Sequence, residues 1–130
     1  MSGRGVAGLA AWLAPAMLLC AGLVPILPGA ASAHAFLARA VPGVGSTVAS
    51  APAELSIDFT EGVEPAFSRI EVSDAGGAKV DRNDAHAEGG GSRLAIGLKP
   101  LPPGRYLVSW QAVSVDTHRT QGSFSFTVAP

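Results

Sequence analysis

Sulfur is scarce in this 130-residue chain, which contains one cysteine and two methionines. All three (Met1, Met17 and Cys20) lie within the first 33 residues. Residues 34–130 therefore have no disulfide bond and no thiolate or thioether ligand, so this part of the chain depends on a hydrophobic core for stability. A soft ion such as Cu(I) would be poorly served there, because soft metals prefer sulfur ligands.

The chain also lacks an excess of basic residues. Nine lysines and arginines stand against ten acidic residues. Residues 34–130, which exclude Arg4, keep eight basic and ten acidic side chains and thus a formal charge of −2. Binding to nucleic acid would need a basic face, so we expect no nucleic-acid partner.

The first 33 residues have the three parts of a secretory signal peptide. The positively charged Arg4 precedes a long apolar run, and Ala31-Ser32-Ala33 forms a small-residue cleavage site. An uncleaved membrane anchor is the alternative, since the run approaches the length of a bilayer span. That run, however, is interrupted by Pro15, Pro25 and Pro28. We predict a cleaved signal peptide over residues 1–33 and one exported domain over residues 34–130.

Residues 34–130 alternate between apolar and polar side chains in several short runs separated by glycine and proline turns. Such a period of two predicts half-buried β-strands. A weaker strand is expected around residues 36–40. Six or seven short strands predict an all-β fold, an antiparallel β-sandwich of immunoglobulin-like or cupredoxin-like form. The predicted inward-facing sets are Leu55/Ile57/Phe59, Ile70/Val72, Leu94/Ile96/Leu98, Tyr106/Val108/Trp110 and Phe124/Phe126/Val128.

Cleavage after Ala33 would make His34 the first residue of the exported protein. An N-terminal histidine offers a metal its α-amine and its imidazole, which together close a chelate ring. Asp116 and His118 lie two residues apart, and side chains at this spacing point the same way from a strand or a tight turn. An amine, two imidazoles and one carboxylate form an N3O set, and tetragonal N,O coordination suits Cu(II). These residues therefore predict a Cu(II) site.

The remaining histidine, His86, lies in a glycine-rich segment with Asp81, Asp84 and Glu88. Three acids and one histidine could bind a metal weakly. We instead expect a solvated, flexible loop, because glycine raises the cost of ordering a site.

Several further segments follow one another along the chain in the order of a known family. They are His34 with Leu37, Pro42 with Gly45-Ser46, Ala51-Pro52, Phe59-Thr60-Glu61, Pro103-Gly104-Arg105-Tyr106, Trp110, Ser114-Val115-Asp116-Thr117-His118 and Gly122-Ser123-Phe124. Together they resemble the CopC family of periplasmic copper-resistance proteins. The resemblance implies a seven-stranded Greek-key β-sandwich or barrel, a periplasmic location and often a polytopic membrane partner of the CopD type. We also expect a monomer.

The resemblance places Cu(II) on His34, Asp116 and His118, with Glu61 close by. Asp116 has a second interpretation, in which it orients His118 through a hydrogen bond. Glu61 ends a predicted strand, where a solvated charge is the ordinary role, and we expect it beside the ligands rather than on the metal. The methionine-rich Cu(I) loop of some family members is absent from this sequence.

Three functions are compatible with these residues. We favour a protein that is not an enzyme and that binds Cu(II) to sequester or deliver it in copper homeostasis and resistance. The alternatives are a metal-independent module that docks on a membrane copper transporter, and a copper oxidase of the lytic polysaccharide monooxygenase type. The oxidase is disfavoured because Asp116 would occupy a coordination position needed by oxygen. The sequence leaves open whether copper is delivered, stored or removed, and how many ions bind.

Overall fold

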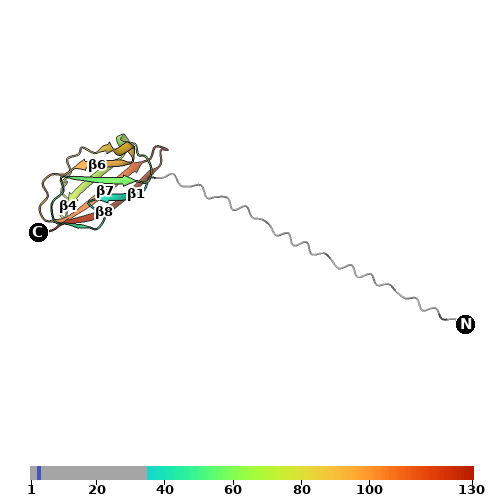
Figure 1. Ribbon diagram of the computed structural model, residues 1–130, viewed down its shortest axis with the longest axis horizontal. Coiled ribbons are helices and arrows are strands. Elements are labelled where there is room, and N and C mark those ends of the chain that lie inside the picture. The colour runs from blue at the N-terminus through green and yellow to red at the C-terminus, as the bar shows by residue number, and fades with distance from the viewer. Residues whose placement is uncertain (1–2, 4–34) are drawn as a thin grey trace. The chain divides into compact units, whose positions relative to one another are not determined.

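Eight strands and two short 3-10 helices make up the described part of the chain, residue 3 and residues 35–130, in the computed structural model (Figure 1). The predicted signal peptide over residues 1–33 and the candidate ligand His34 lie outside this part, apart from residue 3. Neither described helix is long and apolar enough to cross a membrane. In chain order the elements are β1 Leu37–Val41, β2 Thr47–Val48, β3 Glu54–Phe59, η1 Pro65–Phe67, β4 Arg69–Asp74, β5 His86–Glu88, η2 Gly89–Gly91, β6 Arg93–Gly97, β7 Gly104–Val113 and β8 Arg119–Val128.

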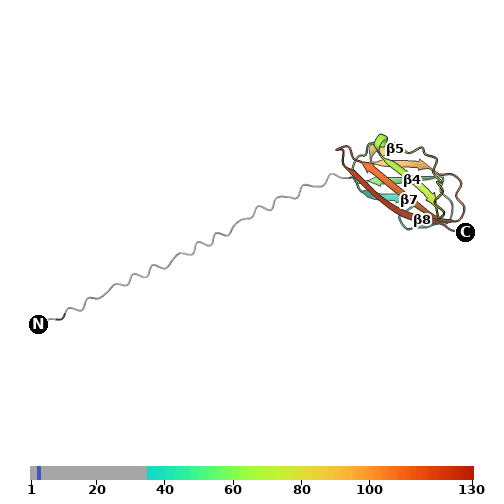
Figure 2. The ribbon, with the colours of Figure 1, turned by 180° about the vertical axis from the view of Figure 1, so that it is seen from behind.

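The strands form two four-stranded sheets, which Figure 2 shows from the opposite side. One sheet has the order β1-β3-β6-β5 and the other has the order β2-β8-β7-β4. Neighbouring strands are antiparallel except for β2 and β8, which run parallel. The prediction of an all-β fold with two sheets is confirmed. Residues 35–130 contain eight strands where the resemblance implied seven, and two of the eight, β2 and β5, have only two and three residues.

The predicted alternation places one face of each long strand in the core. In β3, Leu55, Ile57 and Phe59 are buried, whereas the residues between them are partly exposed. The inner faces of the two sheets contribute to one hydrophobic cluster. Across it, Phe59 of one sheet meets Trp110 of the other edge-on, with 5.3 Å between the ring centroids and 68° between the ring planes. Edge-to-face pairs of this kind add to the stability gained from burial alone.

Tyr106 combines an apolar and a polar role in the same core. Its ring stacks on Phe126 with 5.4 Å between centroids. Its hydroxyl donates a hydrogen bond to the carbonyl oxygen of Pro102. Burial raises the pKa of the phenol, because the charged form would lose its hydration. The prediction that Tyr106 faces the core is confirmed.

The segment around His86 is a strand and not the flexible loop that the sequence suggested. His86 pairs with Ala95 and Glu88 pairs with Arg93, which makes β5 the edge strand of the first sheet. All three β5 residues are exposed or only partly buried. The prediction of a loop was wrong because an edge strand with no buried face shows no apolar alternation. The glycines of η2 follow β5 directly.

Candidate metal centre

A tight turn joins β7 to β8 and carries two of the three predicted ligands. The backbone NH of Ser114 donates to the carbonyl of His118 at 2.9 Å, and the NH of Thr117 donates to the carbonyl of Ser114 at 2.8 Å. Thr117 adopts φ 71°, a left-handed conformation that closes the turn. Asp116 and His118 therefore lie on one short, hydrogen-bonded turn, the second of the two arrangements that their spacing predicted.

Within this turn Asp116 and His118 contact each other. Oδ2 of Asp116 lies 3.2 Å from Nδ1 of His118, and the two side chains are 33% and 57% exposed. A carboxylate at Nδ1 holds the proton on that nitrogen, so the lone pair that a metal needs lies on Nε2. This contact supports the interpretation in which Asp116 orients His118, and it leaves the second carboxylate lone pairs accessible to a cation.

Ser114 fixes the aspartate from the inner side of the turn. Its hydroxyl donates to Oδ1 of Asp116 and also lies 3.2 Å from the carbonyl oxygen of His118. The hydrogen bond from Ser114, with smaller contributions from His118, holds the pKa of Asp116 below its usual value of 3.8. Asp116 is consequently ionised throughout the neutral range and is ready to act as an acceptor or a ligand.

Ser114 was not predicted to have this role, although the sequence contains a signal for it. Tyr106, Val108, Trp110 and Ala112 are buried at every second position of β7, and Ser114 continues this period. Ser114 is fully buried. A hydroxyl in the core-facing register needs a partner, and here that partner is Asp116.

The segment that follows β3 brings Glu61 to the same end of the domain. The NH of Val115 donates to the carbonyl of Gly62 at 3.1 Å, and Val63 forms an isolated bridge with Ser114. Glu61 itself is exposed. The structure therefore bonds the segment that follows Glu61 to the turn that carries Asp116.

The start of the described chain is anchored at this end too. Ala35 is fully buried, and its carbonyl accepts a hydrogen bond from the hydroxyl of Thr120. The NH of Phe36 donates to Oγ1 of Thr60 at 3.0 Å, and the NH of Thr60 donates back to the carbonyl of Phe36 at 2.8 Å. Thr60 precedes Glu61, and Thr120 lies two residues after His118. Ala35, the residue that follows His34, is therefore held between the segment that carries Glu61 and the segment that carries Asp116 and His118.

The structure thus brings together Asp116, His118 and the segment of Glu61, and it anchors the chain immediately after His34. The predicted ligand His34 falls outside the described residues. The positioning roles of Thr60 and Thr120 were not predicted. Neither threonine has a distinguishing local pattern, because each role depends on a partner far away in the sequence.

Comparisons with known proteins identify the family of this chain. The family model of the CopC domain matches residues 37–129. The chain is 34% identical over 119 residues to "Copper resistance protein C" of Escherichia coli, covering 85% of this chain and 94% of that protein. It is 35% identical over 104 residues to "Copper transport protein CutJ" of Bacillus subtilis, where the match spans 78% of this chain but only 19% of CutJ.

A solved structure gives the same result for the fold. The crystal structure of CopC from Methylosinus trichosporium OB3b superposes with a TM-score of 0.70 at 34% sequence identity. The match covers 75% of this chain and 95% of that one. The family model covers nearly all of the described domain, and the sequence relatives and the fold point to the same family. This chain belongs to the CopC domain family.

Proposed function

We propose that the exported protein begins at His34 and binds Cu(II) through His34, Asp116 and His118, in order to sequester or deliver copper. One observation carries the proposal. The hydrogen bond from Thr120 to the carbonyl of Ala35 fixes the residue after His34 beside the strand that begins directly after His118. Membership of the CopC domain family supports copper as the ion.

Covalent geometry limits how far His34 can be from the turn. Consecutive Cα atoms are about 3.8 Å apart, so His34 starts one such step from the anchored Ala35. Its α-amine and imidazole would supply two nitrogens, and Nε2 of His118 a third. The carboxylate of Asp116 completes an N3O set, which suits Cu(II) better than the softer Cu(I). In this proposal Glu61 lies beside the ligands and contributes negative charge without binding the metal.

Asp116 has two alternative tasks in this site, because a carboxylate that contacts Nδ1 lies across the ring from a metal on Nε2. Its Oδ2 lies against Nδ1 of His118 and fixes the orientation of the ring. To bind the metal instead, the carboxylate has to leave Nδ1 and turn toward the ion. Replacing Asp116 therefore removes a ligand or frees the ring of His118.

Binding should depend on pH through the nitrogen ligands. Imidazoles and the α-amine bind a metal only when they are deprotonated. Their ordinary pKa values are about 6.5 and about 7.7–8.0, so affinity should fall as the pH drops from 8 to 6. Asp116 does not limit binding in this range, since its pKa lies below 3.8.

The proposal also includes export and a partner. Cleavage after Ala33 would release the domain into the periplasm as a monomer. A membrane transporter of the CopD type is the partner that the family resemblance suggests. The metal-independent docking module and the copper oxidase make different predictions, since the first binds no copper and the second consumes oxygen or peroxide with a polysaccharide.

The position of cleavage provides the test. The intact mass of the exported protein shows whether His34 is the first residue. Cu(II) titration then compares residues 34–130 with a version that retains Ala33, in which the free amine is displaced from the chelate. Losing one strong ligand should weaken binding by several kcal/mol, given about 10–16 kcal/mol for four-ligand structural zinc sites. Equal affinities of the two versions would rule out the amine as a ligand.

Substitutions at the turn test the other ligands. His118→Ala should abolish tight Cu(II) binding, and Asp116→Ala should weaken it and shift the visible and EPR spectra of the bound ion. His86→Ala is the matched control, because it removes the other described histidine and leaves the β7–β8 turn intact. Tight Cu(II) binding that survives His118→Ala but not His86→Ala would place the site elsewhere.

A further inference from the structure

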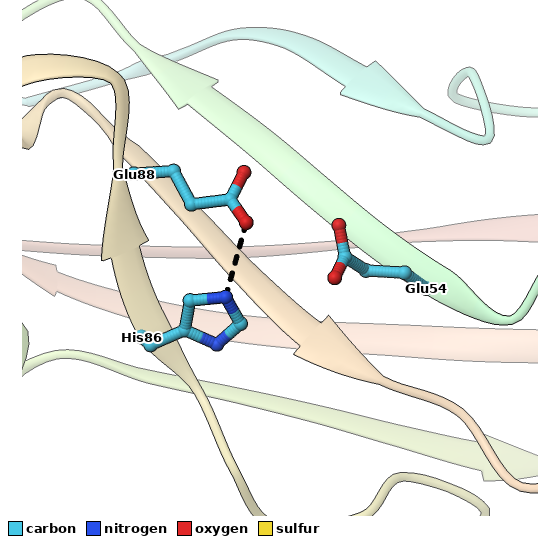
Figure 3. Close-up of side chains that lie close together, drawn as sticks. All are labelled: Glu54, His86 and Glu88. Atoms are coloured by element: carbon cyan, nitrogen blue, oxygen red, sulfur yellow. Dashed lines mark hydrogen bonds and ion pairs between the residues drawn. The ribbon is translucent and has the colours of Figure 1, made fainter.

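A second group of potential ligands lies on the outer face of the sheet β1-β3-β6-β5. Glu54 comes from β3, and His86 and Glu88 come from β5. Their ligand atoms all lie within 4.8 Å of one another, and Nε2 of His86 lies 3.0 Å from Oε1 of Glu88. Figure 3 shows the imidazole and both carboxylates turned toward one another above the strand between them.

The strand between them explains how residues from β3 and β5 can meet. β6 separates the two, so their backbones are two strand spacings, about 9.6 Å, apart. Glu54 pairs with Gly97 and His86 pairs with Ala95, which puts two very small residues beneath the cluster. Ala95 faces outward, between the core residues Leu94 and Ile96, and yet it is fully buried. The long side chains from both sides lie over it.

The imidazole of His86 is held in one orientation. Its Nδ1 lies 2.9 Å from the carbonyl oxygen of Asp84, which can only accept a hydrogen bond, so Nδ1 carries a proton. Asp84 is itself fixed, because its Oδ1 accepts a hydrogen bond from the NH of Gly97 at 2.7 Å. A backbone partner at one ring nitrogen that directs the other toward the ion is a regular feature of metal-binding histidines. Here Nε2 is the nitrogen directed at the carboxylates.

When His86 is protonated, a proton occupies this position in the metal-free protein. The hydrogen bonds to the Asp84 carbonyl and to Glu88 raise the pKa of His86 above its usual 6.5. The proton on Nε2 bridges the imidazole and the carboxylate of Glu88. A cation that binds here would replace that proton and would meet two carboxylates and one neutral nitrogen.

The neighbouring guanidinium groups donate hydrogen bonds to partners outside the cluster. Arg93 lies opposite Glu88 in the strand register, but its Nε donates to Oδ1 of Asp58 at 2.6 Å and its Nη2 donates to Oδ2 at 3.2 Å. Nε of Arg82 donates to the carbonyl of Leu98 at 3.2 Å. Both guanidinium groups are thus oriented by other partners. The cluster itself remains accessible, since the side chains of His86 and Glu88 are 48% and 38% exposed.

We propose that Glu54, His86 and Glu88 form a second, weaker site for a borderline divalent cation, Zn²⁺ or Cu²⁺. One nitrogen and two carboxylates with open positions for water match the ligand types of these ions. Donor atoms about 2.0–2.2 Å from a tetrahedral Zn²⁺ lie roughly 3.3 Å apart, close to the observed separation of Nε2 and Oε1. Glu54 has to move inward, which its flexible side chain permits. Ca²⁺ and Mg²⁺ are disfavoured because they prefer all-oxygen sites.

The test uses the exported domain, residues 34–130, with His118→Ala, which disables the Cu(II) site proposed above and retains this cluster. ZnCl₂ is titrated while the NMR signals of the His86 imidazole and of the backbone amides of His86 and Ala95 are followed. We expect saturable shifts at one equivalent that centre on β5 and the facing end of β3. In the same background His86→Gln and Glu54→Gln should each weaken Zn²⁺ binding by about tenfold or more. Glu71→Gln, which removes an exposed strand carboxylate on β4, should leave it unchanged.

The outcomes separate this site from the first one. Zn²⁺ shifts that fail to saturate, or that persist unchanged in His86→Gln, would overturn the second site whatever happens at His118. A domain whose Cu(II) and Zn²⁺ binding is confined to β5 and is unaffected by His118→Ala would overturn the proposed function and keep the second site. His86→Gln in the otherwise unaltered domain is a second measurement. It should remove the weaker of two Cu²⁺ equivalents and retain the tighter one.

Discussion

The hydroxyl of Thr120 donates a hydrogen bond to the carbonyl oxygen of Ala35, a residue 85 positions earlier in the chain. This contact joins the first buried residue of the described domain to the strand that starts after His118. Together with the hydrogen bonds between Phe36 and Thr60, it holds Ala35 near the β7–β8 turn, on which the proposed copper site depends. Substitutions at this contact are therefore informative about metal binding.

Thr120→Val should weaken Cu(II) binding while leaving the fold intact. Valine keeps the shape of threonine but cannot donate, so the buried carbonyl of Ala35 loses its partner. A net contribution of roughly 0.5–1.5 kcal/mol per hydrogen bond corresponds to about a twofold to twelvefold loss of affinity. Competition titration against a Cu(II) chelator measures the change. Thr127→Val, at the other end of β8, is the control. An equal loss of Cu(II) affinity in this variant would show that the effect does not depend on the hydrogen bond between Thr120 and Ala35.

Ser114→Ala should raise the pKa of Asp116 toward 3.8, because the hydroxyl that stabilises the carboxylate is lost. Since the folded-state pKa is depressed, this interaction stabilises the fold above the unfolded pKa, about 3.9, and the stabilisation disappears as the pH falls through the folded value. The stability difference between the two proteins should therefore be larger at pH 6 than at pH 2.5. NMR titration of the Asp116 carboxyl and denaturation at both pH values measure this.

The exposed Ser109 of β7 is the control for that experiment, because Ser109→Ala removes a hydroxyl from the same strand without touching the turn. An Asp116 pKa that stays depressed in Ser114→Ala would show that His118, and not Ser114, is the main cause.

Gly122→Ala should destabilise the domain by about 1–3 kcal/mol through overpacking. Gly122 lies opposite Trp110 in the β7–β8 pair, and a Cβ atom there would come within 2.7 Å of Cζ2 of the indole. The rigid ring, packed on Phe59, has to shift. Urea denaturation measures the loss. Gly43→Ala, whose Cβ would approach no atom closer than 3.7 Å, should change stability by less than about 0.5 kcal/mol. Similar stabilities for both variants would contradict the packing argument.

Reduction should release the proposed copper ion. Residues 34–130 contain neither methionine nor cysteine, so only nitrogen and oxygen donors are available. These suit Cu(II) and leave Cu(I) without a soft ligand. Ascorbate treatment of the copper-loaded domain in the presence of a Cu(I) chelator should transfer the ion completely, as followed by the colour of the chelate. Tight retention of Cu(I) against the chelator would mean that the ligand set is different.

The long strands were predictable because each buries one face. Burial of one face makes apolar residues recur at every second position, as Leu55 and Ile57 do in β3 and Phe124 and Phe126 do in β8. The edge strand β5 was not predictable, since both of its faces meet water and its residues carry no such period. Its existence depends on pairing with β6, which is a long-range property of the sheet.

The sequence by itself determined the chemistry of the candidate site. The residue types of His34, Asp116 and His118, and the absence of sulfur after residue 33, select nitrogen and oxygen coordination. The short spacing of Asp116 and His118 directs their side chains the same way from one strand or one turn. Only the tertiary structure decided what lies next to that turn. Thr120 reaches Ala35, and Glu54 reaches the side of His86 over Ala95, because pairing of distant strands brings these residues within hydrogen-bonding or ligand distance. No local pattern encodes such contacts, since each depends on how the whole sandwich packs.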